Sequence, residues 1–213
     1  IRLESMVPIY LIRDTRNDYI ETIKVYNDSI INYSKFHVEA IEYVDFISGN
    51  FKIKKGIIIL SHDIVHNLLT YPNSQRSDIW KNFLKFYKGV KILIVQDEYY
   101  HVDLINNLIS EYKIQIVLTC CPNIESVNLL YSKVPADVQF INVLTGYTNR
   151  NNSFKLIKDK EIDIFYRGRK LHPQYGKLGY DKYEIGEKFK KYSNELKINI
   201  SSKCNDRIYD GWL

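Results

Sequence analysis

Polar residues follow directly on several short apolar runs of this 213-residue sequence, where an α/β protein places catalytic or binding groups. In open α/β sheets, ligands bind beyond the carboxyl ends of the strands, so these residues are the first candidates for a site. Carboxylates and imidazoles there can transfer protons, and guanidiniums can bind phosphate. The strand-end residues are Arg13 and Asp14; Ser61, His62 and Asp63; Gln96, Asp97, Glu98 and Tyr99; Thr119 and Cys120; Thr145, Gly146 and Tyr147; and Arg167, Gly168 and Arg169.

The adjacent acids Asp97 and Glu98 follow the apolar run KILIV, within the stretch KILIVQDEYYH (91–101). A strand that ends in paired acids is typical of a phospho-receiver domain, in which the acids bind magnesium. Receiver chemistry also needs a phospho-accepting Asp at the end of a later strand. The corresponding run, FINVL, ends instead in Thr145 and Gly146. The receiver interpretation therefore fails, and the two acids remain candidates for proton transfer.

His62 and His66 are four residues apart in HDIVH, with Asp63 between them, which resembles a shortened HExxH zinc motif. In zinc peptidases that motif lies inside a helix, whereas here it directly follows the apolar run IIIL. We therefore expect His62 at a strand end, as a polar rim residue or a substrate contact. The sequence offers no evident third ligand, so no metal site is predicted.

The segment IDIFYRGRKLHPQYGKLGYDKYEIG (162–186) has the features of a phosphate site. Its apolar run ends in Arg167, Gly168 and Arg169, and a helix is expected to open near Asp181–Lys182. A helix N-terminus presents unpaired N–H groups, and Arg can bind phosphate through two parallel hydrogen bonds. These features predict a diphosphate site, and the alternative is that the two arginines and the lysine are solvated.

Short apolar runs alternate with helical patterns along the chain, and this alternation positions the polar residues at one edge of a sheet. It predicts a doubly wound, Rossmann-like α/β domain over residues 7–150, with a mostly parallel sheet covered on both sides. In the helix after Asp78, the residues predicted to form the buried edge are Ile79, Phe83 and Phe86. The expected strands are 8–12, 41–44, 56–60, 91–95, 114–118 and 140–144.

A second Rossmann-like unit is expected at 162–213, after a polar stretch that begins at Gly146. In it, the apolar runs 162–166 and 198–201 flank a helix with Asp181 as its cap. The unit therefore holds a single β-α-β and is incomplete. The first six residues, IRLESM, read as a cloning remnant before a native start at Met6, and we leave them out of the fold.

Composition and charge exclude several classes of protein. The net charge of +5 is mild and the basic residues are spread out, so the charge pattern does not indicate a nucleic-acid-binding surface. Three cysteines, of which Cys120 and Cys121 are adjacent, form neither a disulfide framework nor a metal knuckle and favour a reducing compartment. The longest apolar run, IIIL, is far shorter than a membrane span. A cytoplasmic protein is expected.

From residue 90 onward, an ordered series of short motifs resembles a bacterial family of GT-B-type glycosyltransferases of surface polysaccharide and lipopolysaccharide biosynthesis. Each motif is weak alone, and the resemblance rests on their order and spacing. Residues 7–90 add only a compatible fold. The motifs are QDEY (Gln96–Tyr99), TCCP (Thr119–Pro122), LTGY (Leu144–Tyr147), YRGR (Tyr166–Arg169), LGYDK (Leu178–Lys182) and DRIYDGW (Asp206–Trp212).

The resemblance implies two Rossmann-like domains. The first would hold a glycan or lipid-linked acceptor, and the second would hold a nucleotide-sugar donor. It also implies that the enzyme needs no further cofactor and lies at the inner face of the membrane. Arg167, Gly168, Arg169 and Lys182 would bind the donor diphosphate. The candidates for the base that takes the acceptor proton are Asp97, Glu98, His62 and Asp14, and the sequence does not rank them. Acceptor-side cleft residues would be Arg13, Asp63, Gln96, Tyr99, Thr145 and Tyr147.

The chain departs from this family in one respect. Family members continue past the Trp segment with most of the second domain, including a Glu-Ser-Gly-rich stretch near the donor. We therefore expect this chain to be the N-terminal part of a longer enzyme and to be inactive alone. A non-catalytic nucleotide- or glycan-binding module is the alternative.

Overall fold

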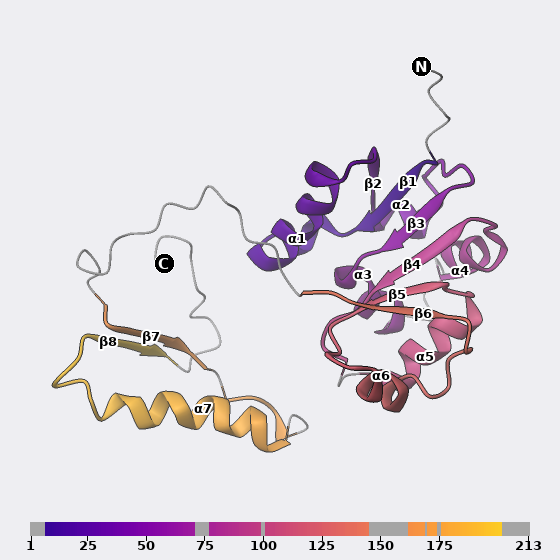
Figure 1. Ribbon diagram of the computed structural model, residues 1–213. Helices are drawn as coiled ribbons and strands as arrows, with labels where there is room; N and C mark the ends of the chain where they lie inside the picture. The colour runs from indigo at the N-terminus through magenta and orange to yellow at the C-terminus, as the bar shows by residue number, and fades with distance from the viewer. Residues whose placement is uncertain are drawn as a thin grey trace. The chain divides into compact units, whose positions relative to one another are not determined.

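The computed structural model describes residues 7–70, 77–98, 101–144, 162–168, 170–173 and 176–201 (Figure 1). The chain divides into two compact units, Ile1–Thr148 and Asn149–Leu213. Each unit has its own parallel strands and is described by itself. The predicted remnant at residues 1–6 lies outside the described residues.

The first unit is built on a sheet of six parallel strands in the order β2-β1-β3-β4-β5-β6. This is a doubly wound order, in which the chain adds β2 on one side of β1 and all later strands on the other. The direction of winding therefore reverses between β1 and β3. The strands are β1 (Ile9–Arg13), β2 (Val38–Glu42), β3 (Ile57–Leu60), β4 (Val90–Ile94), β5 (Ile116–Thr119) and β6 (Gln139–Asn142).

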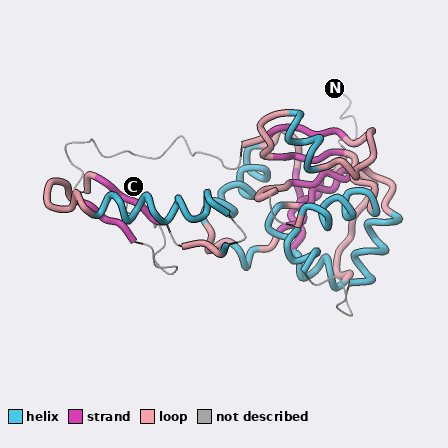
Figure 2. Tube along the Cα trace, turned by 90° about the horizontal axis from the view of Figure 1, so that it is seen from below, coloured by secondary structure: helices cyan, strands magenta, loops and turns pink. Residues whose placement is uncertain are grey.

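Helices lie on both faces of this sheet, as Figure 2 shows. Right-handed crossovers place α1 on one face, where Asp28 of α1 contacts Arg13 at the end of β1. The helices that follow α1 in the chain contribute to one apolar core with the strand residues of the opposite face. The helices are η1 (Thr15–Asn17), α1 (Glu21–Tyr33), α2 (Tyr43–Ser48), α3 (His62–Thr70), α4 (Ser77–Phe86), α5 (Val102–Glu111) and α6 (Ile124–Leu130).

The architecture confirms the predicted doubly wound parallel α/β domain, but two local predictions are wrong. The second strand is Val38–Glu42 instead of 41–44, because Tyr43 begins α2 and is buried there together with Phe46. In α4, the buried side chains are Trp80 and Leu84, whereas Ile79 and Phe86 are exposed. Of the predicted edge of α4, only Phe83 packs against the core.

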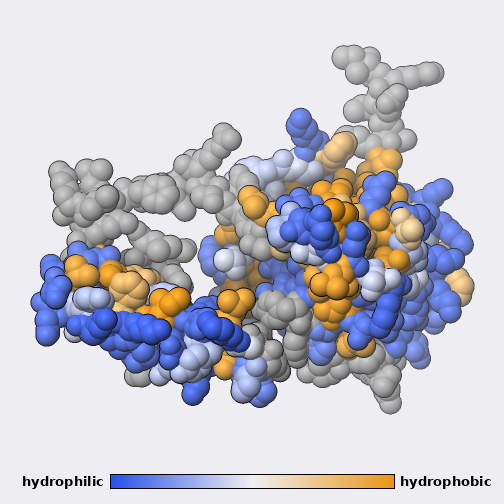
Figure 3. Space-filling view, turned by 60° about the horizontal axis from the view of Figure 1, so that its bottom comes forward, coloured by the Kyte–Doolittle hydropathy of each residue, from blue (hydrophilic) through white to orange (hydrophobic). Residues whose placement is uncertain are grey.

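The second unit consists of two parallel strands, β7 (Ile164–Arg167) and β8 (Ile198–Ser201), joined by α7 (Gly176–Lys190). The helix begins at Gly176, five residues before the predicted cap at Asp181. Hydrophilic residues cover most of the visible face of this unit in Figure 3, interrupted by apolar side chains. Among the exposed large apolar residues of α7 are Leu178, Ile185 and Phe189.

Candidate functional site

A pocket of about 300 Å³ lies in the first unit, beyond the carboxyl ends of β1, β3 and β4. In doubly wound sheets, ligands bind where the winding reverses, and here that place is between β1 and β3. The pocket wall mixes aliphatic, amide, imidazole and carboxylate side chains. The lining residues are Asn17, Ile20, Ile23, His62, Asp63, Val65, Asn67, Leu69, Val95, Gln96, Asp97, His101 and Ile105.

Asp63 lies in the first turn of α3, where the positive end of the helix dipole stabilises a carboxylate. Its Oδ2 accepts a hydrogen bond from the backbone N–H of Asp14 at 2.8 Å, which joins α3 to the end of β1. The residue is 7% exposed, and its Oδ1 accepts no hydrogen bond from the described residues. One oxygen of Asp63 is thus structural, and the other is buried without a hydrogen-bond partner among the described residues.

Asp14 is the residue that follows β1, and its carboxylate is occupied by protein partners. Arg16 donates to it from Nε at 2.7 Å and from Nη2 at 2.6 Å, and the backbone N–H of Arg16 donates at 3.2 Å. Asn67 adds a hydrogen bond at 3.3 Å. The hydrogen bond to Asp14 raises the pKa of Arg16 against the opposing effect of burial. Asp14 is buried beside the pocket and does not line it.

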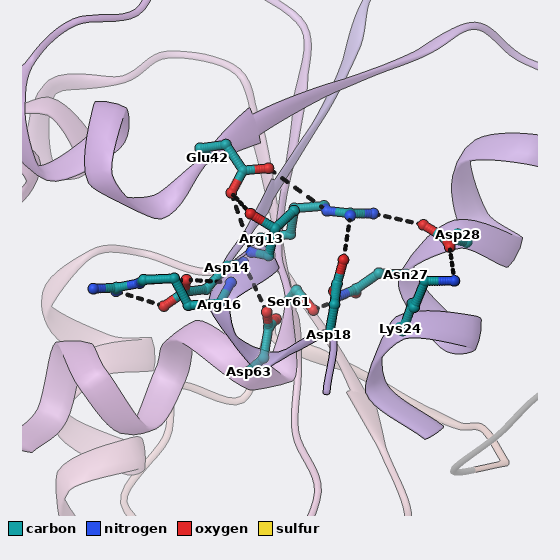
Figure 4. Close-up of polar contacts among 11 residues, drawn as sticks. Arg13, Asp14, Arg16, Asp18, Lys24, Asn27, Asp28, Glu42, Ser61 and Asp63 are labelled. Atoms are coloured by element: carbon teal, nitrogen blue, oxygen red, sulfur yellow. Dashed lines mark hydrogen bonds and ion pairs between the residues drawn. The ribbon is translucent and has the colours of Figure 1, made fainter. Parts of the chain in front are cut away.

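Arg13 forms a charged cluster on the α1 side of the sheet (Figure 4). Its guanidinium lies 3.1 Å from Asp18, 2.7 Å from Asp28 and 3.8 Å from Glu42. Burial alone would lower the pKa of Arg13, but the hydrogen bond to Asp28 and the three negative charges outweigh it and raise that pKa. The cluster joins β1 to β2, to α1 and to the turn before α1. Arg13 therefore has a structural role and is not a lining residue of the pocket.

The neighbours Asp97 and Glu98 have different surroundings. Asp97 has φ 56°, a left-handed conformation that Asp tolerates better than most residues, and it is exposed at the pocket. Glu98 is buried, and one of its oxygens accepts hydrogen bonds from the Cys120 N–H at 3.1 Å, the Tyr131 hydroxyl at 3.4 Å and the Thr119 hydroxyl. Glu98 thus holds the end of β5 and the end of α6 in place.

The buried charge of Glu98 affects the groups around it. Burial is the main reason why the pKa of Cys120 is raised to about 11, and the charge of Glu98 is the second. The same two causes raise the pKa of Tyr131 above its ordinary value. Burial, followed by the charge of Glu98, also acts to raise the pKa of Cys121. At neutral pH these groups remain protonated, and the Cys120 thiol and the Tyr131 hydroxyl act as hydrogen-bond donors.

Two histidines line the pocket from different elements. His62 begins α3, so it belongs to the helix and does not lie at the strand end predicted for it. His101 immediately precedes α5 and has φ 56°. The side chain of His66 lies outside the described residues. No group of three or more His, Cys, Asp or Glu residues in the described part of the chain is placed to hold a metal ion.

In the second unit, Arg167 is tied to the neighbouring strand. Its guanidinium donates to the backbone oxygen of Asn199 at 3.0 Å and to the side-chain oxygen of Asn199 at 2.8 Å. It also lies over the ring of Phe165, 4.2 Å from the centroid. A Cβ on Gly168 would lie 2.6 Å from the backbone oxygen of Lys182, so glycine permits α7 to pack against the end of β7. The side chain of Lys182 is exposed.

The pocket brings together four of the residues that the sequence singled out, which are His62, Asp63, Gln96 and Asp97. Sequence reasoning missed His101, Asn17 and Asn67, which line it as well. His101 is the last residue of the QDEYYH stretch, and its position shortly after the strand-end acids was the one feature of the sequence that could have indicated it. The predicted residues Tyr99, Thr145, Gly146, Tyr147 and Arg169 lie outside the described residues.

No helix in the described ranges has the length and apolar character needed to cross a membrane. Comparisons of the chain with protein-family models, with curated proteins and with solved structures give no match.

Proposed function

We propose that the first unit is the acceptor-binding domain of a GT-B-type glycosyltransferase of bacterial surface-polysaccharide synthesis. The observation that carries the proposal is the pocket beyond β1, β3 and β4. Its hydrogen-bonding groups, among them Asp63, Asn67 and Gln96, suit sugar hydroxyls, and its aliphatic wall suits the C–H faces of a sugar ring.

The reaction requires a base at this pocket. The acceptor hydroxyl loses its proton to the base as its oxygen attacks the anomeric carbon of the donor, and the bond from that carbon to the diphosphate breaks. Four residues are candidates from the sequence. Glu98 and Asp14 are already engaged by several donors from the protein, whereas Asp97 and His62 line the pocket. These contacts favour Asp97 or His62 as the base.

The second unit would bind the diphosphate of a nucleotide-sugar donor. Departure of the nucleoside diphosphate builds up negative charge, which cationic side chains stabilise. Lys182 is exposed on α7 and can take this role together with Arg169. Because Arg167 is hydrogen-bonded to Asn199, its expected contribution is to position the YRGR segment.

A non-catalytic glycan- or nucleotide-binding module is the second candidate. The observation in its favour is that Arg167, one of the two arginines expected at the diphosphate, has Asn199 and the ring of Phe165 as partners within the protein. A module of this kind would bind sugar at the pocket of the first unit and would not cleave a donor.

Turnover separates the two candidates. The full-length protein is incubated with a panel of nucleotide-sugars and glycan acceptors, and release of nucleoside diphosphate is measured. We expect release with one donor and a decrease of about 100-fold or more in Asp97→Asn or His62→Gln, as for loss of a general base. Asp137→Asn, an exposed carboxylate outside the pocket, is the matched control. Absence of nucleoside diphosphate release across the panel would contradict the proposal that the protein is a glycosyltransferase.

A further inference from the structure

Asp14 lies behind the pocket wall, where both of its carboxylate oxygens accept hydrogen bonds from Arg16. The residue is 3% exposed and does not line the pocket. Its Oδ1 accepts from the backbone N–H of Arg16 at 3.2 Å and from Arg16 Nε at 2.7 Å, and its Oδ2 accepts from Arg16 Nη2 at 2.6 Å (Figure 4). A carboxylate paired in this way with a guanidinium offers only acceptors to any further neighbour.

That further neighbour is Asn67 of α3, which does line the pocket. The side-chain nitrogen of Asn67, Nδ2, donates a hydrogen bond to Asp14 Oδ2 at 3.3 Å. The reversed amide would bring the Asn67 oxygen against a carboxylate oxygen, and two acceptors repel each other. Asp14 therefore selects one of the two orientations of the Asn67 amide.

The selected orientation leaves the carbonyl oxygen of Asn67 for the pocket. Asn67 Oδ1 accepts no hydrogen bond from the described residues, yet it is not among their buried atoms that lack a partner. The residue as a whole is half-buried at the pocket wall. A ligand can thus reach this oxygen, and a carbonyl oxygen can only accept a hydrogen bond.

We propose that Asp14 is a positioning residue that sets the specificity of the pocket. By holding the Asn67 amide through its nitrogen, it makes Asn67 Oδ1 the acceptor for one hydroxyl group of the bound sugar. A ligand with an acceptor-only group at that place leaves the oxygen unpaired and binds more weakly. The hydroxyl group rests on the proposed function, whereas the orientation of Asn67 is a property of the free protein.

Fluorinated sugars test the direction of this hydrogen bond, because fluorine is close in size to a hydroxyl group and cannot donate. The ligands are glucose and the four derivatives in which fluorine replaces one of its non-anomeric hydroxyls. Their dissociation constants are measured by NMR titration of the chain. We expect the derivative fluorinated at the hydroxyl that meets Asn67 to bind about tenfold more weakly than glucose, for the loss of one hydrogen bond.

Asp14→Asn should exchange the donor and the acceptor at Asn67, which identifies that derivative. The new amide keeps its oxygen at the Oδ1 position, where Arg16 donates twice, so its NH2 group takes the Oδ2 position facing Asn67. The Asn67 amide then turns over and presents its own NH2 group to the pocket. We expect the penalty of that derivative to fall to about twofold or less, because fluorine no longer faces an acceptor. The penalties of the other three derivatives should stay unchanged, and a thermal melt checks the fold.

Arg16→Gln is the matched control, because it removes the guanidinium and leaves the Asp14 carboxylate facing Asn67. This variant should keep the preference for glucose over the derivative. Asn67→Ala should remove the preference, and the addition of Asp14→Asn to Asn67→Ala should change it no further. A preference that survives Asn67→Ala would overturn the assignment of this oxygen.

A measurement on the free protein separates the inference from the function on which it rests. A nuclear Overhauser effect should connect the side-chain NH2 protons of Asn67 with the β protons of Asp14, and Asp14→Asn should remove it. Its absence from the unsubstituted chain would overturn the inference, and so would equal penalties in that chain and in Asp14→Asn. If the effect is present but neither glucose nor any derivative binds, the orientation of Asn67 stands and the sugar-binding role of the pocket is contradicted.

Discussion

At the residue scale, Asp97 and Glu98 show how two neighbouring acids acquire different roles. The left-handed conformation of Asp97 leaves its side chain at the pocket. The next residue, Glu98, is buried against Thr119 and Cys120. Both acids were equal candidates from the sequence, because the position after a strand does not reveal the backbone conformation there. Glu98 is best understood as a buried anchor that sets the surroundings of the adjacent cysteines.

The reactivity of the Cys120 thiol depends on the buried carboxylate of Glu98 beside it. Burial first, and then the charge of Glu98, raise its pKa from 9.0 to about 11, so the thiol stays protonated and slow to react through neutral pH. In a protein with Cys121→Ser and Cys204→Ser, alkylation by iodoacetamide should accelerate with pH up to about 11. A rate that levels off near the ordinary pKa of a cysteine would contradict the burial of this thiol beside Glu98.

At the scale of elements, Arg13 fastens β1 to its surroundings. Its guanidinium reaches Asp18, Asp28 and Glu42, which belong to the turn before α1, to α1 and to β2. Arg13→Ala would leave these carboxylates without their shared cation, so we expect it to lower the free energy of unfolding by more than about 2 kcal/mol. Urea denaturation measures the difference.

The matched control for Arg13 is Lys133, whose ion pair with Asp103 at 2.7 Å is exposed on both sides. Lys133→Ala should change the free energy of unfolding by less than about 1 kcal/mol, because exposed ion pairs contribute little. An equal effect of the two substitutions would show that the Arg13 cluster does not fasten the strand.

The elements also show where sequence reasoning succeeds. The runs GIIIL and KILIV predict β3 and β4 to within a residue, because a short and mainly apolar run fits a strand buried in a parallel sheet. In α4, the buried residues Trp80 and Leu84 each lie one position after a residue that was predicted to be buried. Aromatic residues occur on both sides of that helix, so Phe86 and Trp80 were equal candidates, and packing selects Trp80.

At the scale of the whole molecule, alternation of strands and helices suffices to predict the doubly wound sheet and the edge on which a pocket forms. It does not predict which strand-end residues share that pocket. The sequence assigned Arg13, Asp14 and Glu98 to the site with the same weight as His62 and Asp97. Ion pairs and hydrogen bonds within the protein engage the first three, and partners such as Asp28, Asn67 and Thr119 are too distant in the sequence to be visible in local spacing.

The central claim is that the pocket beyond β1, β3 and β4 is a sugar site. Backbone amide NMR shifts recorded while the chain is titrated with glucose test it most directly. We predict that the largest shifts occur at Asp63, Gln96, Asp97 and His101, with Asn67 beside them. Shifts confined to the second unit, or to the far end of the sheet near Ile57, would contradict the claim.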